Sequence, residues 1–187
     1  MNQSLFTIHE HGTSMPPLRP HDVAVALQLL LSPGLAYREL SHAVGISQGE
    51  AHNSVKRLIA SRLAREDRAV NSHALHDFVV SGVPYAFSAT LGPETRGIPT
   101  AHSAPPFADE LSDDNPIVWP SASGKVRGAS VTPLYPGAPA TARLNPPLYE
   151  LLAAVDEVRI GRARERERAK SFLRERILTR KYPQQID

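Results

Sequence analysis

The chain of 187 residues contains no cysteine, so disulfide bonds, thiolate zinc sites and cysteine nucleophiles are excluded. It lacks any apolar run long enough to cross a bilayer, and its mean hydropathy is -0.27. Its first residues show neither a basic start nor the apolar segment that directs secretion. We therefore expect a cytoplasmic protein with no membrane partner.

Sequence motifs of catalysis are also lacking. The chain has no G-x-S-x-G, no P-loop, no H-E-x-x-H and no glycine-rich nucleotide turn. Two closely spaced histidine pairs occur, His9 with His11 and His73 with His76, but neither has a third ligand at a useful spacing. We expect no enzymatic activity, no cofactor and no metal site.

Net charge is only +2, which says little about partners, but the distribution of charge says more. Residues 36–70 carry six basic side chains against four acidic ones, and residues 143–181 carry eleven against six. The stretch between them is acidic, with three basic side chains against six acidic ones. Positive charge is thus concentrated in two segments of an otherwise mildly acidic molecule.

Residues 37–65 have the pattern of two short helices joined by a tight turn. Gly45 stands where such a turn requires a positive φ or a close approach, and glycine permits both. Ser47 and Glu50 have the S-x-x-E spacing that starts a helix, and we expect the Glu50 carboxylate to fold back onto the backbone there.

The second helix of this pair is predicted to have two different faces. Its apolar residues recur at helical spacing, which predicts a buried underside. Its other face is rich in the donors that contact base edges and phosphates. The apolar set is Ala51, Val55, Leu58 and Ile59, and the polar set is Gln48, His52, Asn53, Lys56 and Arg57.

This pattern resembles the helix-turn-helix core of winged-helix transcription regulators, broadly of the MarR-like and IclR-like kind. The resemblance lies in the order apolar-x-x-x-apolar-Gly-apolar-Ser, followed by small or apolar residues, and covers residues 20–72. It implies a β-wing after Leu63, with Glu66 and Asp67 at its turn, and a second helix that enters the major groove. The DNA contacts it implies are Ser47, Gln48, His52, Asn53, Lys56, Arg57, Arg65 and Arg68. A solvated polar face used only for protein contact is the alternative.

The fold class we predict is α+β, mainly α. Twelve of the 17 prolines fall between residues 83 and 147, which excludes long helices there. The predicted organisation is a flexible N-terminal tail (1–18), a winged helix-turn-helix DNA-binding domain (19–82), a Pro-rich β-hairpin region (83–145) and a C-terminal helical segment (146–182).

The Pro-rich region contains a weak internal repeat, in which residues 85–100 align with residues 117–132. Each copy predicts a strand, a glycine-containing turn and a second strand, so we expect two related β-hairpins. Arg96 and Arg127 occupy matching positions and are candidates for contact with an anion or a partner carboxylate. The alternative is a structural pairing with acidic residues of the same region, Asp109, Glu110 or Asp113.

Residues 146–181 return to helical periodicity. A glycine, Gly161, interrupts the pattern and is expected to bend or split the helix. We interpret the apolar stripe before it as a surface for dimerisation, which would match a palindromic operator. This stripe consists of Leu148, Leu151, Leu152, Val155 and Val158.

The function predicted from these features is sequence-specific binding of double-stranded DNA by a non-catalytic transcriptional regulator that acts as a homodimer. An alternative remains open: an antitoxin-like protein whose winged helix binds DNA and whose residues 83–181 bind and neutralise a partner toxin. The two hypotheses are separable, because an antitoxin should co-purify with its partner.

Overall fold

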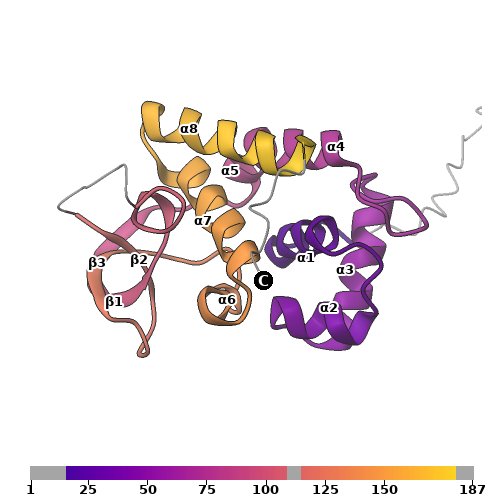
Figure 1. Cartoon of the computed structure of the whole chain (residues 1–187), viewed down its shortest axis with the longest axis horizontal. Coiled ribbons are helices and arrows are strands. Elements are labelled where there is room, and N and C mark those ends of the chain that lie inside the picture. Colours follow the sequence, from indigo (N-terminus) through magenta and orange to yellow (C-terminus); the bar gives the residue numbers. More distant parts are fainter. Residues whose placement is uncertain (1–15, 109–114, 180–187) are drawn as a thin grey trace, which may run out of the picture.

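The computed structural model describes residues 16–108 and 115–179 (Figure 1). Most of the predicted N-terminal tail, including His9 and His11, lies outside this range. Figure 1 shows α1, α2 and α3 at one end of the molecule and the strands at the other, with the C-terminal helices between and above them. The coarse prediction of a mainly helical α+β fold is confirmed.

Helices account for most of the described chain, and one small sheet interrupts them. In chain order the elements are α1 (Pro20–Leu31), α2 (Tyr37–Val44), α3 (Gln48–Ala60), α4 (Ser72–Asp77), the π-helical turn η1 (Phe78–Gly82), α5 (Val83–Ala86), β1 (Leu91–Pro99), the 3₁₀ turn η2 (Ala101–Ser103), β2 (Ile117–Pro120), β3 (Val126–Val131), α6 (Ala138–Leu144), α7 (Pro146–Ile160), α8 (Ala163–Arg174) and η3 (Glu175–Thr179).

Two helices that are buried on every side form the centre of the molecule. In α1 all residues from Asp22 to Leu30 are buried, and in α7 all residues from Leu151 to Arg159 are buried. A helix that is apolar all round is stable only when other elements cover it. The helices α1 and α7 pack against each other, and the remaining elements surround them. One continuous apolar cluster therefore includes residues of all three predicted folded segments.

The N-terminal part, which we call the head, consists of α1, α2, α3 and a hairpin over residues 63–71. The hairpin is reduced to one antiparallel bridge between Ala64 and Val70, closed by a hydrogen bond from the Arg65 amide to the Ala69 carbonyl. Glu66 and Asp67 lie at its tip, where the sequence predicts the turn.

The head is fastened to the rest of the chain by hydrogen bonds at the end of α2. Asn145, the N-cap of α7, donates to the Gln28 side chain at 2.7 Å and to the Ala43 carbonyl at 3.0 Å. Tyr135 donates from its hydroxyl to the Val44 carbonyl at 2.8 Å. These bonds satisfy carbonyls that the last turn of α2 leaves without helical partners.

The three strands close into a small barrel. β1 pairs antiparallel with both β2 and β3, while β2 and β3 pair in parallel. Glycine allows this close approach, because a Cβ atom on Gly97 would lie 2.1 Å from the Trp119 carbonyl oxygen. A substituent on Gly128 would meet the Pro116 carbonyl oxygen at the same distance.

The prediction of two β-hairpins is wrong. The first copy of the repeat begins inside the helix α5 (Val83–Ala86), and Leu91–Pro99 is one continuous strand. Gly92 does not form a turn, because it lies in β1 at an irregularity of the register. The second copy forms two strands, β2 and β3, but they pair in parallel rather than as a hairpin. The two copies instead pair with each other along β1 and β3.

Buried polar contacts join the barrel to α7. Asp156 is fully buried and accepts hydrogen bonds from the Thr100 hydroxyl at 2.9 Å and from the Trp119 indole at 2.5 Å. The guanidinium of Arg159 donates to the other oxygen of Asp156 at 2.5 Å. Burial raises the pKa of Asp156, and the charge and hydrogen bonds of Arg159 oppose that rise.

The apolar stripe of α7 is covered by the same chain. Leu148, Leu151, Leu152, Val155 and Val158 are each at most 1% exposed within the monomer. α7 ends at Ile160 and α8 begins at Ala163, so Gly161 does divide the helical segment. Because α7 belongs to the core of the monomer, its stripe supplies no reason to expect a dimer, and the homodimer remains a prediction without this support.

Candidate nucleic-acid interface

The exposed face of α3 carries four polar side chains in one row. Gln48, His52, Asn53 and Lys56 are all solvent-exposed, and their spacing places them on one side of a helix. The opposite side is buried, with Ala51, Val55 and Leu58 at most 1% exposed. These residues pack toward α1 and α2, so the row rests on a rigid apolar support.

The turn between α2 and α3 has the geometry that its sequence predicts. Gly45 adopts a left-handed conformation with φ 75°, which ends α2. Ser47 caps α3 by accepting a hydrogen bond from the Glu50 amide at 3.1 Å. Such a cap contributes about 1 kcal/mol and fixes the direction in which α3 leaves the turn.

Arg57 does not lie on the exposed face, contrary to its predicted contact with DNA. It is only 4% exposed, and its guanidinium makes a two-point interaction with Asp22, at 2.8 Å from Nε and 2.7 Å from Nη2. It also donates to Glu50 at 2.5 Å and to the Ser54 hydroxyl at 3.1 Å. Arg57 therefore holds α3 to α1 and is committed to the interior of the head.

The Glu50 carboxylate does not return to the backbone, as the predicted capping arrangement requires. Instead it lies beside Arg57 and 2.8 Å from Nε2 of His21, with Arg19 at 3.5 Å. The hydrogen bond from Arg57 is the main cause that lowers the pKa of Glu50, and the contact with His21 lowers it further. The contacts with Arg57 and Arg19 offset the negative charge of Glu50 and so reduce its repulsion of a polyanion.

The two predicted arginines of the wing have different environments. Arg65 has a side chain that is 73% exposed and lies 3.6 Å from Asp67. Arg68 adopts φ 66°, donates to the Leu35 carbonyl at 2.9 Å and lies over the ring of Tyr37 at 5.1 Å. The Tyr37 ring in turn meets His52 edge-on at 5.0 Å. Arg68 thus ties the wing to α2, while Arg65 extends toward solvent.

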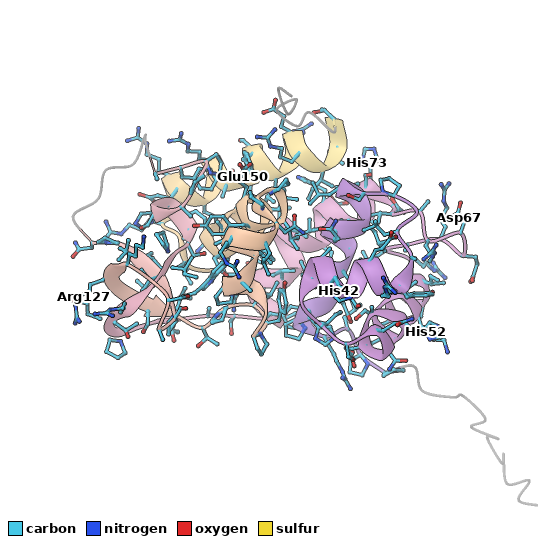
Figure 2. All side chains as sticks on the ribbon, turned by 60° about the horizontal axis from the view of Figure 1, so that its bottom comes forward. His42, His52, Asp67, His73, Arg127 and Glu150 are labelled. Carbon is cyan, nitrogen blue, oxygen red and sulfur yellow. The ribbon has the colours of Figure 1, made fainter. Side chains whose placement is uncertain are left out.

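Arg96 and Arg127 lie on the barrel and are not brought together with α3. Figure 2 shows His52 and Asp67 at one end of the molecule and Arg127 at the other. Arg96 and Arg127 are cross-strand partners between β1 and β3, and Arg127 donates to Glu94 at 2.9 Å on the surface. The three acidic residues predicted as structural partners of these arginines lie outside the described residues. They are Asp109, Glu110 and Asp113.

The sequence prediction missed two kinds of residue in the head. The first is Asp22, the buried partner of Arg57. The sequence feature that could have identified it is a carboxylate inside a largely apolar helix. The second kind is exposed cations next to the predicted DNA contacts. These are Arg38 on α2 and Arg62 shortly after the end of α3. Their signal was only the basic composition of residues 36–70.

No known protein family, curated protein or solved structure matches this chain. The resemblance to winged-helix regulators therefore rests on the residues and geometry described above. Within residues 16–108 and 115–179, no helix combines the length and the apolar character needed to cross a bilayer.

Proposed function

We propose that this protein is a transcriptional regulator that binds double-stranded DNA through the exposed face of α3. The observation that carries the proposal is the row formed by Gln48, His52, Asn53 and Lys56, which is solvent-exposed on a helix whose other side is buried. The glycine turn before α3 and the hairpin after it give the head the element order of a winged helix-turn-helix.

The dimensions of the row suit the major groove. From Gln48 to Lys56 there are eight helical steps of about 1.5 Å, so the row is roughly 12 Å long. One base pair rises about 3.4 Å, and the row therefore spans between three and four base pairs. Asparagine and glutamine amides pair with the N6 and N7 edge of adenine, and a lysine donates to the O6 and N7 edge of guanine.

Phosphate contacts must come from cations other than Arg57, whose charge is neutralised inside the head. Of the predicted phosphate contacts, Arg65 in the hairpin still points to solvent. The exposed Arg38 and Arg62 are two further cations that can contact phosphates. Each phosphate contact contributes about 0.9 to the slope of log K against log salt. We expect a clear but moderate salt dependence, with discrimination between sequences supplied by the α3 row.

The test is a gel shift with the DNA upstream of the protein's own gene, performed at two salt concentrations. Lys56→Ala should weaken binding and reduce its salt dependence. The matched control is Lys125→Ala, which removes an exposed lysine directly before β3. Figure 1 shows β3 at the opposite end of the molecule from α3. Equal effects of the two variants would contradict the assignment of α3.

Asn53→Ala tests sequence reading separately from charge. Because the amide reads a base edge in this proposal, the variant should lose preference for the upstream DNA over a scrambled duplex at unchanged salt slope. Retained DNA binding together with co-purification of a second protein held by residues 83–181 would favour the antitoxin alternative. Failure of the unmodified protein to bind any duplex would contradict both hypotheses.

A further inference from the structure

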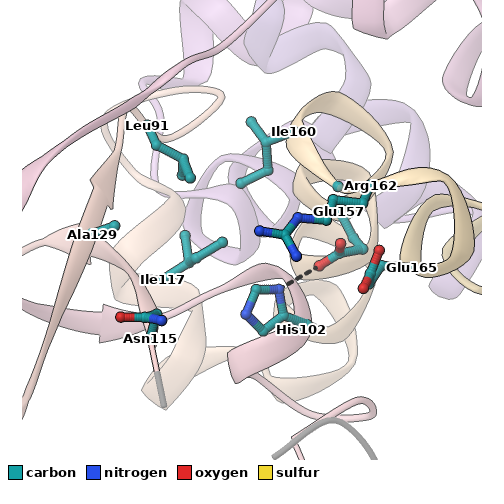
Figure 3. Close-up of a pocket in the computed structure, with 10 residues that line it drawn as sticks. Leu91, His102, Asn115, Ile117, Ala129, Glu157, Ile160, Arg162 and Glu165 are labelled. Carbon is teal, nitrogen blue, oxygen red and sulfur yellow. Dashed lines mark ion pairs between the residues drawn. The ribbon is translucent and has the colours of Figure 1, made fainter. Parts of the chain in front are cut away.

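A pocket of about 330 Å³ lies between the barrel, η2 and the junction of α7 with α8 (Figure 3). This is at the small end of the range for ligand sites in proteins. One wall is apolar and includes Ile117 from β2 and Ile160 from the end of α7. The other wall is polar and includes His102, Glu157, Arg162 and Glu165. None of these residues has a role in the proposed contact with DNA.

Glu157 is the deepest charged group of this pocket. Its side chain is 1% exposed, and neither carboxylate oxygen accepts a hydrogen bond within the described structure. The imidazole of His102 lies next to it, with Nδ1 3.4 Å from Oε2 (Figure 3). A buried carboxylate without hydrogen bonds is costly, because it has lost water and gained no donor in exchange.

A second carboxylate lies beside it. Glu165, in the first turn of α8, also lines the pocket, and its Oε2 is buried without a hydrogen-bond partner. Ionised carboxylates only accept hydrogen bonds. Two of them share this small space with one guanidinium, that of Arg162 (Figure 3). The carboxylates therefore outnumber the arginine by one, and three of their oxygens keep unused acceptor positions for a further donor with positive charge.

The backbone leaves room for Glu157 at this place. A Cβ atom on Gly161 would lie 2.2 Å from Oε1 of Glu157 and 2.4 Å from its carbonyl oxygen. Any residue other than glycine would therefore force the Glu157 carboxylate or the backbone at the end of α7 to shift. Asp156, the neighbour of Glu157 on α7, differs sharply, since both of its oxygens accept hydrogen bonds from the protein.

We propose that this pocket binds a small organic cation, a protonated amine or a guanidinium group on a short apolar body. The cationic group donates to Glu157 and Glu165, and the apolar body lies against Ile117 and Ile160. An organic cation fits better than a metal ion, because residues 16–108 and 115–179 contain no group of three or more His, Asp or Glu arranged to hold a metal. This site is independent of DNA binding and goes beyond it.

The experiment measures binding of simple probes to the full chain by calorimetry and by fluorescence of the single tryptophan, Trp119, on the same strand as Ile117. The probes are propylammonium, butylammonium, hexylammonium and butylguanidinium, with 1-butanol and butyrate as matched neutral and anionic controls. We expect saturable binding of at least one cation and none of butanol or butyrate. Equal binding of a control probe, or no binding of any cation, would overturn the proposal.

Glu157→Gln is the decisive variant, because it preserves shape and removes the charge. It should weaken cation binding at least tenfold, whereas Glu175→Gln, an exposed carboxylate on η3, should leave binding unchanged. The thermal stability of Glu157→Gln should equal or exceed that of the unmodified protein, because this variant loses a buried charge that has no hydrogen bonds. A variant that melts several degrees lower, or still binds the cation fully, would show that Glu157 is a structural residue.

Discussion

Lys56 and Arg57 are adjacent in α3, yet replacing each by alanine should have opposite consequences. Lys56 is exposed on the row that faces solvent, while Arg57 is 4% exposed and makes a two-point interaction with Asp22. Lys56→Ala should therefore change DNA binding and leave the fold intact. Arg57→Ala should destabilise the fold, because it leaves the carboxylate of Asp22, 1% exposed, without its counter-ion.

The expected loss of stability for Arg57→Ala follows from the burial of both partners. Removing one member of a buried ion pair costs about 3–5 kcal/mol, because the remaining charge is left without compensation. For a chain of this size, each kcal/mol corresponds to about 2–4 °C in Tm, so Tm should fall by roughly 6–20 °C. Lys56→Ala, a surface change, should stay within about 0.5 kcal/mol of the unmodified protein.

Thermal unfolding and binding titrations at several salt concentrations distinguish these outcomes. Lys56→Ala should reduce the salt slope by at most about 0.9, because it removes one cation from the face that meets the polyanion. Asp22→Ala combined with Arg57→Ala should cost less than the sum of the single changes, because the second removal no longer exposes an unpaired charge. If Arg57→Ala kept its Tm and lost salt dependence, Arg57 would be a phosphate contact and the buried pair would be refuted.

Two further predictions concern the contacts that hold the head in place. The pKa of Glu50 lies below its ordinary value of 4.5, mainly because of the Arg57 hydrogen bond. Its ionised form therefore stabilises the fold above pH 4.5, and this contribution is lost as pH falls through the lowered pKa. The Tm difference between the unmodified protein and Glu50→Gln should shrink below pH 4.5, and a constant difference would contradict the assignment. Tyr135→Phe should cost about 1–3 kcal/mol in urea unfolding, because the buried Val44 carbonyl loses its donor. Tyr85→Phe is the control, since Tyr85 is 86% exposed and should change nothing.

The helix-turn-helix segment could be predicted because its signals are local. Gly45 at a left-handed position and Ser47 at the start of α3 act within a few residues, and a periodic apolar stripe identifies the buried side. The same local logic failed for Arg57. Its position next to Lys56 suggested a polar face, but its environment depends on Asp22, 35 residues earlier in the chain.

The barrel could not be predicted because its pairing is not local. Gly92 and Pro93 resemble a turn in the sequence, yet Leu91–Pro99 continues as one strand that pairs with β2 and β3. The role of the apolar stripe of α7 could not be predicted from the sequence for the same reason. Its periodicity is equally compatible with a dimer interface and with a central core helix, and only the packing of α1 and the barrel around it decides between them.

The pocket of Glu157 and Glu165 was likewise invisible in the sequence. Glu157 lies between two residues of the apolar stripe of α7, and Glu165 lies in the first turn of α8. The other residues of the pocket come from distant elements that include β2 and η2. Gly161 was recognised as the point at which the helix divides. Its second role, leaving room for the Glu157 carboxylate, depends on a side chain one turn earlier and emerges only from the three-dimensional arrangement.

Site-specific photo-crosslinking tests the central claim, that α3 contacts the duplex, most directly. A photoreactive amino acid replaces Asn53 on α3 in one sample and Lys125 on the barrel in another, and each is irradiated with labelled upstream DNA. The proposed function predicts a crosslinked complex from position 53 and none from position 125. Crosslinking from position 125 alone, or from neither position under conditions in which the DNA is bound, would contradict it.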